Sequence, residues 1–355
     1  MSFIDRGGVQ SHALFHLRRR GWAVLRFAGQ ITFTFFGLLL ATFLIGRVVP
    51  VDPVLAVVGD RASQSTYDAA YIALGLDKPL WEQFYLYTVR VLQGDFGQSF
   101  LTKRPIVEDI ARVFPATLEL ATVAILLGTL IGVPVGVLAA VRQGRLTDQI
   151  VRVLGLVGYS APIFWLGLLG LLVFYANLGW VAGPGRIDIA YEYNFTKVTG
   201  ILLIDTAIAG EWAAFGNVVS HLALPATLLG YFSMAYISRM TRSFMLAELA
   251  QEYVTTARVK GVSEARIIWG HALRNAAVPL VTVIALSYAS LLEGSVLTET
   301  VFAWPGLGMY LTNSLQNADM NAVLGCTLVI GAIFVGLNLL SDLLYAVLDP
   351  RVRRS

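Results

Sequence analysis

The stretch LATVAILLGTLIGVPVGVLAAV occupies positions 120–141 and holds no charged residue. A helix needs about 20 consecutive apolar residues to cross the hydrocarbon core of a bilayer. This run therefore predicts a membrane-spanning helix, and the fold depends on how many such runs the chain carries.

Five further runs without Asp, Glu, Lys or Arg are long enough to cross a bilayer. They occupy positions 27–46, 153–185, 212–238, 275–292 and 320–341. The third and fourth runs of the chain exceed one crossing, so each is expected to hold one helix and part of a loop. The sequence therefore predicts an all-α integral membrane protein with six transmembrane helices. The spans are expected at about 27–49, 116–141, 151–176, 222–240, 276–297 and 322–346.

Composition agrees with lipid as part of the solvent. Only 14% of the 355 residues are charged and 56% are hydrophobic, whereas a soluble domain of this length needs a charged surface. The formal net charge of +3 is too small to suggest a nucleic-acid partner. A single cysteine, Cys326, excludes a disulfide framework or a thiolate metal site. The four histidines, among them His12 and His16, are too scattered to predict a metal site, and no catalytic residue is assigned.

Lysine and arginine are distributed unequally between the two sides of the membrane. Segments 1–26, 142–152, 239–274 and 349–355 hold 17 of the 26 basic residues. Because basic loops stay in the cytoplasm, we expect these segments, and so both termini, to be cytoplasmic. The first apolar run is longer than that of a cleaved signal peptide and is expected to remain. The chain then divides into a cytoplasmic segment 1–26, a six-helix domain 27–348 and a cytoplasmic tail 349–355.

Two segments on the opposite side are long. The segment 51–114 carries turn signals such as Gly94-Asp95-Phe96-Gly97 and is expected to form short helices on the outer face. The segment 177–221 carries aromatic residues that include Tyr193 and Trp212. These aromatics are expected either at the level of the lipid headgroups or against a partner.

The segment between the fourth and fifth spans has the most informative pattern. Apolar residues recur there three and four positions apart, which is the spacing of one helix face. They are Leu246, Leu249, Ala250, Tyr253, Val254 and Ala257. Gly261 is expected to end this helix, because glycine readily adopts the left-handed conformation found at helix C-termini. Arg258 and Lys260 occupy the last turn, where the helix dipole favours cations.

A second short helix is expected after this glycine. Ser263 can cap it, and its apolar stripe is Ala265, Ile268, Trp269 and Ala272. The segment 246–275, called the coupling loop below, is thus expected to be two amphipathic helices joined at a glycine, directly before a span. The pattern leaves two interpretations open. Either a cytoplasmic protein binds the loop, or both stripes pack on the inner ends of the membrane helices or in the lipid interface.

Residues 251–264, QEYVTTARVKGVSE, and 271–276, HALRNA, resemble the cytoplasmic signature of binding-protein-dependent ABC permeases. The general pattern of these proteins is Glu-Ala-Ala, three residues, Gly, nine residues, then Ile-x-Leu-Pro. Here Thr255-Thr256-Ala257 occupy the places of Glu-Ala-Ala, and Gly261 is the glycine. His271 and Leu273 stand where the pattern has Ile and Leu, and the proline comes late, at Pro279. These departures are usual in the oligopeptide, dipeptide and nickel branch, to which this chain is closest.

Other stretches resemble the same branch. Glu299 and Trp304-Pro305-Gly306-Leu307-Gly308 resemble its last outer loop, and Pro115-Ala116-Thr117 resembles the region before its second span. Asp349-Pro350-Arg351 resembles its C-terminal end. The resemblance covers about residue 25 to the end, although the segment 181–219 matches no pattern of this branch.

The resemblance implies a type I ABC importer permease fold and the first, B-type, permease subunit of an importer in a bacterial inner membrane. Besides the lipid bilayer, the implied partners are a second homologous permease subunit, two ATP-binding cassette ATPase subunits and an extracytoplasmic solute-binding protein. The ATPases, rather than this chain, would bind ATP and Mg and grip the coupling loop. The implied ATPase-coupling residues are Glu252, Tyr253, Ala257, Arg258, Lys260, Gly261, Ser263 and Glu264.

The chain has no Gly-x-x-x-x-Gly-Lys-Ser/Thr phosphate loop, so we do not expect an ATPase or another enzyme. The alternative is a secondary transporter or channel that works without ATPase partners. A proton relay needs ionisable groups deep in the spans. We expect no such group there, because Glu119 is expected in the first turn of the second span and Glu293 at the outer end of the fifth span, where each can reach water. Glu293 could instead line the translocation pathway and meet a peptide amine. The solute stays open among dipeptides, longer peptides, opines, nickel chelates and oligosaccharides, with peptide as the default.

Overall fold

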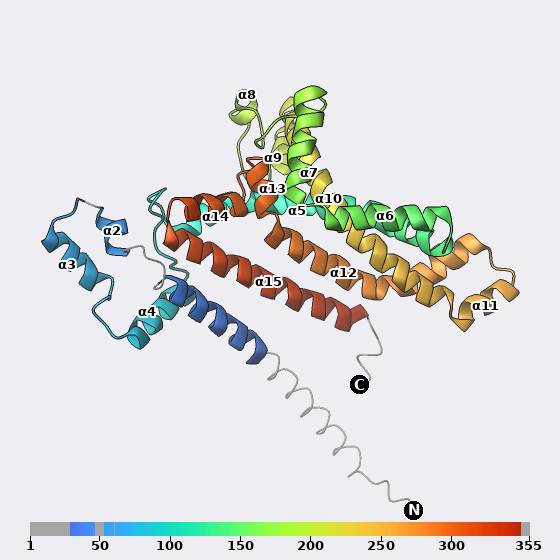
Figure 1. Ribbon diagram of the computed structural model, residues 1–355, viewed down its shortest axis with the longest axis horizontal. Helices are drawn as coiled ribbons and strands as arrows, with labels where there is room; N and C mark the ends of the chain where they lie inside the picture. The colour runs from blue at the N-terminus through green and yellow to red at the C-terminus, as the bar shows by residue number, and fades with distance from the viewer. Residues whose placement is uncertain (1–28, 47–52, 60, 349–355) are drawn as a thin grey trace, which may run out of the picture. The chain divides into compact units, whose positions relative to one another are not determined.

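The computed structural model describes residues 29–46, 53–59 and 61–348 (Figure 1). The expected N-terminal segment 1–26, with His12 and His16, and the expected tail 349–355 lie outside the described residues. The chain divides into two compact units, Met1–Gly94 and Asp95–Ser355. Every regular element in the described ranges is a helix, which confirms the all-α prediction.

The first unit holds the apolar helix Gly29–Gly46 and three shorter helices. These are α2 (Pro53–Val58), α3 (Gln64–Ala73) and α4 (Leu80–Leu92). Phe43 on the apolar helix packs against Phe84 on α4, with ring centroids 5.3 Å apart. The hydroxyls of Thr42 and Tyr87 lie 3.0 Å apart in the same contact. The expected short helices are present, and their position relative to the membrane stays a prediction.

The second unit is built on four long helices. They are α5 (Ile106–Val141), α10 (Trp212–Leu249), α12 (Leu273–Gly294) and α15 (Met320–Leu348). The shorter elements are α6 (Leu146–Ser160), α7 (Ile163–Gly170), the π-helix η1 (Leu171–Asn177), α8 (Ile189–Glu192), α9 (Leu202–Ala209), α11 (Glu252–Val259), the π-helix η2 (Arg266–Ala272), α13 (Val296–Val301) and α14 (Leu307–Gln316). In Figure 1, α12 and α15 run side by side.

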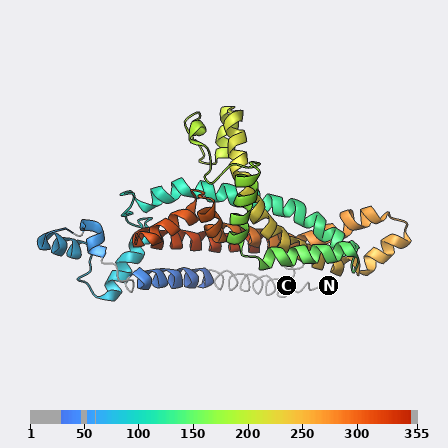
Figure 2. The ribbon, with the colours of Figure 1, turned by 45° about the horizontal axis from the view of Figure 1, so that its top comes forward.

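Five helices of the described residues are long and apolar enough to cross a membrane, or six if one bent pair counts as a single span. The two halves of that pair, Leu146–Gly158 and Ile163–Asn177, stand at 96° to each other (Figure 2). The expected span at about 151–176 therefore corresponds to two helices joined at a bend. Pro162 accounts for the break, because the residue before a proline is disfavoured in the helical conformation. Ala161 is accordingly extended, with ψ 133°.

In the described residues each of the other five expected spans falls largely on one helix, but the helices of the second, fourth and fifth spans begin earlier than predicted, the fifth at Arg266. α5 begins at Ile106 rather than near 116, and α10 runs from Trp212 to Leu249. Their added turns carry charged residues such as Asp109 and Glu248. A search for uncharged runs stops at the first charge, whereas a helix can continue past the hydrocarbon into water.

Glycines bring α5 and α10 together. A Cβ built on Gly132 would lie 3.1 Å from the Met234 carbonyl oxygen, and one on Gly136 would lie 2.5 Å from that of Ser238. Small residues four positions apart let membrane helices approach backbone to backbone. The spacing is visible in the sequence, so it could have predicted which face of α5 meets a neighbouring helix.

Candidate functional site

The coupling loop has the expected two-helix form, with one correction. α10 continues to Leu249, so Leu246 and Leu249 belong to it and the first loop helix is only Glu252–Val259. The break comes just before α11, where Gln251 is extended at ψ 150°. No glycine or proline lies at this break, so the apolar spacing predicted one helix across it. Figure 1 shows α11 at one end of its unit, at the tip of the turn between α10 and α12.

Gly261 ends α11 as predicted. Its φ of +75° is left-handed. The N–H of Val262 donates to the Ala257 carbonyl at 3.1 Å, and the N–H of Gly261 donates to the Arg258 carbonyl at 3.0 Å. These two bonds form a Schellman motif. A Cβ on Gly261 would meet nothing within 4 Å, so backbone conformation alone constrains this position.

Arg258 and Glu264 form an ion pair across that turn. Arg258 Nε lies 2.7 Å from Glu264 Oε1, and Nη2 lies 3.3 Å from Oε2. The hydrogen bond from Arg258 lowers the pKa of the exposed Glu264 carboxyl below its usual value. Arg258 is therefore engaged within the loop. Lys260 is exposed and makes no ion pair with any residue in the described ranges.

Glu248 ties three helices together, a role that the sequence did not reveal. Its Oε2 accepts a hydrogen bond of 2.8 Å from the Tyr253 hydroxyl on α11 and one of 3.4 Å from Asn275 Nδ2 on α12. Burial, and then the bond to Glu248, raises the pKa of Tyr253. Val254 is the fully buried residue of α11, whereas Tyr253 and Ala257 are partly buried and Glu252 is exposed.

The second loop helix begins directly after Ser263, but the Ser263 hydroxyl makes no capping hydrogen bond in the described part of the chain, and the winding of the helix differs from the prediction. Residues Arg266–Ala272 form a π-helix, in which hydrogen bonds span five residues and side chains rotate away from an α-helical stripe. Ala272 is buried as expected. Ile267 is fully buried instead of Ala265 and Trp269, both of which are exposed. Packing against the bundle therefore accounts for only part of the predicted stripe, and Ala265 and Trp269 are left on the outside of the loop.

Buried apolar residues fix the loop to the bundle. The cluster is Val137 and Ala140 of α5, Met245 of α10, Ala272 of η2 and Ala276 of α12. Beside it, Arg242 of α10 makes two bonds, of 2.6 and 2.8 Å, to Asp148 at the start of α6. The helix is continuous over Arg266–Gly294. A displacement of η2 must therefore move the apolar span that follows it.

Glu299, one of the family-like residues outside the loop, is fully buried on α13. It accepts hydrogen bonds from the hydroxyls of Thr117 (2.7 Å) and Ser295 (2.9 Å). It also accepts from the backbone N–H groups of Gly308 (2.7 Å) and Met309 (3.1 Å). Burial raises the pKa of this carboxyl, and the four donors oppose that rise.

Glu119 overturns one expectation. Since α5 begins at Ile106, Glu119 lies well inside the helix rather than in its first turn, and it is buried. Arg186, from the segment 177–221, pairs with its Oε2 at 2.6 Å, and the Leu203 N–H donates to its Oε1 at 2.7 Å. A buried charge needs such partners. Glu119 is therefore a buried and paired acid within α5, and the expectation that no acid lies deep in the hydrocarbon stays a prediction.

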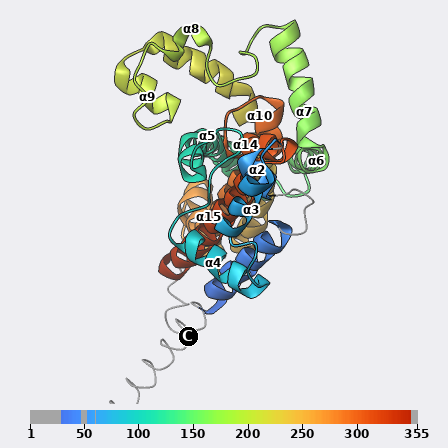
Figure 3. The same cartoon turned by 90° about the vertical axis from the view of Figure 1, so that its left-hand side faces the viewer.

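The segment 177–221 is thereby attached to the bundle. The Arg186 guanidinium lies 5.7 Å from the ring centroid of Trp304, a fully buried residue that donates through Nε1 to the Ala116 carbonyl at 2.9 Å. Figure 3 shows α8 and α9 of this segment near the first turns of α10, and α7 on the other side. Tyr193 and Trp212 are exposed, so both interpretations of these aromatics stay open.

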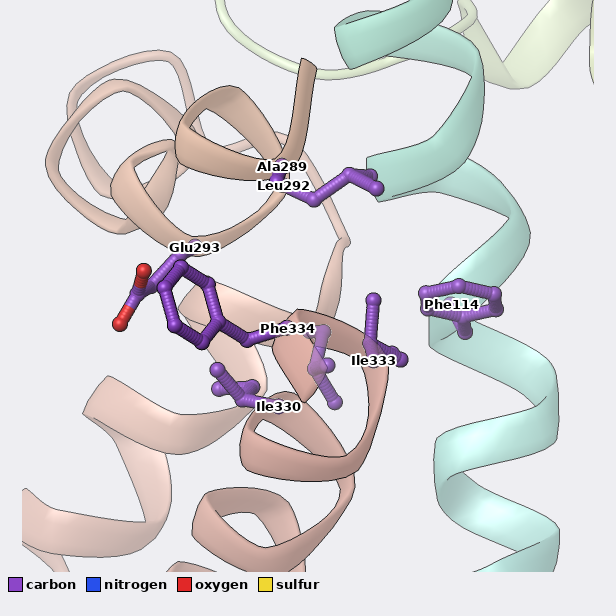
Figure 4. A pocket seen from close by; sticks show the side chains of 8 residues that line it. Phe114, Ala289, Leu292, Glu293, Ile330, Ile333 and Phe334 are labelled. Atoms are coloured by element: carbon purple, nitrogen blue, oxygen red, sulfur yellow. The ribbon is translucent and has the colours of Figure 1, made fainter. Parts of the chain in front are cut away.

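Glu293 lies at the C-terminal end of α12, where the sequence predicted it. Its side chain is exposed and makes no hydrogen bond or ion pair with any residue that the structure describes. Figure 4 shows it at the edge of a small apolar recess. Besides Glu293, the recess is lined by Phe114 of α5, Ala289 and Leu292 of α12, Leu307 of α14, and Ile330, Ile333 and Phe334 of α15.

Known proteins resemble most of the chain. The family described as binding-protein-dependent transport system inner membrane component matches residues 132–354, and its N-terminal region matches 22–121. The dipeptide transport system permease protein of Escherichia coli K12 is 44% identical over 334 residues, 93% of this chain and 98% of that protein. The di/tripeptide transport system permease protein of Pseudomonas aeruginosa UCBPP-PA14 is 42% identical over 331 residues, again 93% and 98%. An inward-facing methionine ABC transporter structure is 20% identical with TM-score 0.43, over 67% of this chain and 92% of its own.

Proposed function

We propose, from the premise that this chain belongs to the family of binding-protein-dependent transport system inner membrane components, that it forms half of the pathway by which short peptides enter a bacterial cell. Membership makes the chain a multi-pass inner-membrane permease subunit of an ABC importer, in the peptide branch. The ATPase activity of such an importer resides in partner subunits.

Dipeptides are the proposed solute. The relatives at 44% and 42% identity are named for dipeptide and for di- or tripeptide transport. Each of them is matched over 98% of its length, so the likeness includes the membrane helices as well as the coupling loop. Near-complete coverage supports a pathway of the same kind.

We assign three kinds of partner to the chain. A second, homologous but different permease forms the other half of the pathway. Two ATPase subunits bind ATP and Mg and contact the coupling loop. An extracytoplasmic binding protein delivers the peptide from the opposite side. This arrangement requires both termini and the coupling loop to be cytoplasmic, which the distribution of Lys and Arg supports.

The observation that carries the coupling role is the continuous helix Arg266–Gly294, which joins an exposed loop to an apolar span. ATP-driven closure of the ATPases displaces the loop, and this helix transmits the displacement into the bundle. Differential affinity of the ATPases for the two conformations drives the change. Tyr253, Ala257 and Gly261 supply the contact and its turn. Lys260, rather than the engaged Arg258, is the cation available to an acid on the ATPase.

Reconstitution of the purified complex tests the proposal. Liposomes are prepared with this chain, its partner permease and the ATPases in the membrane. They are expected to accumulate a labelled dipeptide only when ATP is on the side of the membrane that carries the ATPases and the binding protein is on the other side. Uptake by this chain alone, driven by an ion gradient and indifferent to ATP, would establish the secondary transporter instead.

A further inference from the structure

The helix α11 has little packing of its own. It is eight residues long, Val254 is its buried residue, and it packs chiefly on η2. A helix of this length is not stable without contacts to other elements. Two turns flank it, one at Gln251, which is extended, and one at Gly261, which is left-handed. Bending at either turn can therefore absorb a displacement of α11 before it reaches the membrane helices.

Glu248 bridges both turns. It lies in the last turn of α10, Tyr253 lies on α11 beyond the first turn, and Asn275 lies in the first turn of α12 beyond the second. A single oxygen, Oε2 of Glu248, accepts from the Tyr253 hydroxyl at 2.8 Å and from Asn275 Nδ2 at 3.4 Å. Hydrogen bonds to an ionised acceptor are stronger than those between neutral groups. These three residues, called the Glu248 cluster below, therefore join α10, α11 and α12 at one atom.

The Tyr253 hydroxyl is occupied inside the loop. Burial and the bond to Glu248 raise the pKa of Tyr253, so the hydroxyl stays protonated at neutral pH and keeps donating. The outer side of α11 is formed by other residues. Glu252, Thr255, Thr256 and Val259 are exposed and lie three and four positions apart, which is one helix face. A protein that pushes on this face moves a helix whose inner side is already bonded to Glu248.

We propose that Glu248 is a positioning residue for energy coupling, which makes α11 and the start of α12 move together through Tyr253 and Asn275. A displacement of α11 then reaches the continuous helix Arg266–Gly294 instead of being lost at the two turns. Glu248 does this as a hydrogen-bond acceptor and needs no contact with peptide or nucleotide. This inference rests on the proposed function and deepens it by naming the residue that joins the loop helix to the span.

The number of peptides imported per ATP hydrolysed tests this role. The complete transporter and its binding protein are reconstituted in liposomes, and labelled Ala-Phe uptake and ATP hydrolysis are measured on the same vesicles. Glu248→Leu removes the acceptor and is expected to lower the ratio about fivefold, the factor that corresponds to one hydrogen bond. Glu248→Gln keeps an acceptor oxygen and is expected to retain most of the wild-type ratio. Glu211→Leu, at an exposed acid outside the loop, is expected to match wild type.

This ratio separates coupling from folding. A merely structural role would reduce the amount of assembled transporter and lower both rates together, which leaves the ratio unchanged. Tyr253→Phe removes the donor but keeps the ring, and is also expected to lower the ratio. Because both substitutions break the same bond, Glu248→Leu combined with Tyr253→Phe is expected to give a ratio no lower than Glu248→Leu alone.

The outcomes distinguish this inference from the proposed function. If the wild-type complex imports no peptide, both fail. If it imports Ala-Phe and Glu248→Leu keeps the wild-type ratio, only this inference fails, and it also fails if the effects of Glu248→Leu and Tyr253→Phe multiply. Should Glu248→Leu not assemble, Tyr253→Phe alone decides, and a wild-type ratio in that variant overturns the inference.

Discussion

The hydroxyl of Thr117 on α5 donates a hydrogen bond of 2.7 Å to Oε1 of Glu299 on α13, across 182 positions of sequence. The same hydroxyl accepts the N–H of Leu307 at 2.8 Å. Two sequence stretches that resemble the family for separate reasons are therefore two sides of one buried contact. Hydrogen bonds between α5, α13 and α14 explain why these two stretches carry polar residues at Thr117 and Glu299.

Thr117→Val is expected to destabilise the protein by about 1–3 kcal/mol, because it leaves the buried Leu307 N–H without an acceptor. The midpoint of thermal unfolding in detergent measures the effect. Thr300→Val is the matched control, since Thr300 is exposed and bonds only the Val296 carbonyl of its own helix and a neighbouring hydroxyl. Equal midpoints for the two variants would contradict the structural role of Thr117.

Arg186→Met is expected to cost about 3–5 kcal/mol, because it leaves the buried Glu119 carboxylate unpaired. Adding Glu119→Gln to this variant is expected to recover part of the loss, since the uncompensated charge is then gone. The control is Lys197→Met in the same outer segment. The side chains of Lys197 and its partner Glu192 are 47% and 38% exposed, so the expected change is below about 1 kcal/mol. A double variant no more stable than Arg186→Met would argue against an ion pair.

Gly261→Val is expected to abolish peptide uptake while membrane insertion continues. A β-branched residue at φ +75° is strained by about 1–2 kcal/mol, so the turn between α11 and η2 changes shape. Gly144 has the same φ of +75° and equally open surroundings, but lies outside the coupling loop. Uptake by Gly144→Val should therefore exceed uptake by Gly261→Val. The assignment of the coupling loop is wrong if Gly261→Val transports like wild type.

Acidification is expected to loosen the tip of the coupling loop. The pKa of Glu264 is lowered in the folded protein, so its pair with Arg258 is intact above the ordinary value of 4.5 and is lost as pH falls through the lower folded value. A spin label at Val259, which is 83% exposed, reports the change as increased mobility. Cys326 is buried and does not compete for the label. In the Glu264→Gln variant the spin label should show the spectrum of increased mobility already at neutral pH. A wild-type label that is equally mobile at all pH values would show that the Arg258–Glu264 ion pair does not restrain the loop.

Sequence rules that depend only on neighbouring residues predicted most of the membrane helices and one turn. Uncharged runs located five of the membrane helices, and the glycine rule located the turn at Gly261. Pro162 also carried a readable signal, since prolines restrict the preceding residue, but the apolar run around it concealed the bend. The coupling loop was thus recognisable in outline from the sequence alone.

Contacts between distant residues could not be predicted in this way. Nothing in the neighbourhood of Glu119 specifies Arg186, and nothing near Glu248 specifies Tyr253 and Asn275 as joint donors. The π-helical winding of η2 likewise has no signal in apolar spacing, because that spacing presumes 3.6 residues per turn. Buried polar partners are set by tertiary packing, so a search for charges along single runs does not reveal which acids are buried and paired.

The pairing of Ala116 with Trp304 imposes an order on biogenesis. α5 leaves the ribosome while the tryptophan, 188 positions later, has not been synthesised. The nascent chain therefore enters the bilayer with Thr117 and Glu119 still lacking their eventual neighbours. Glu119 meets Arg186 and Leu203 first, whereas Ala116 and Thr117 meet their partners only after residues 299–307 have emerged, so a chain that terminates earlier leaves these two residues without those hydrogen bonds.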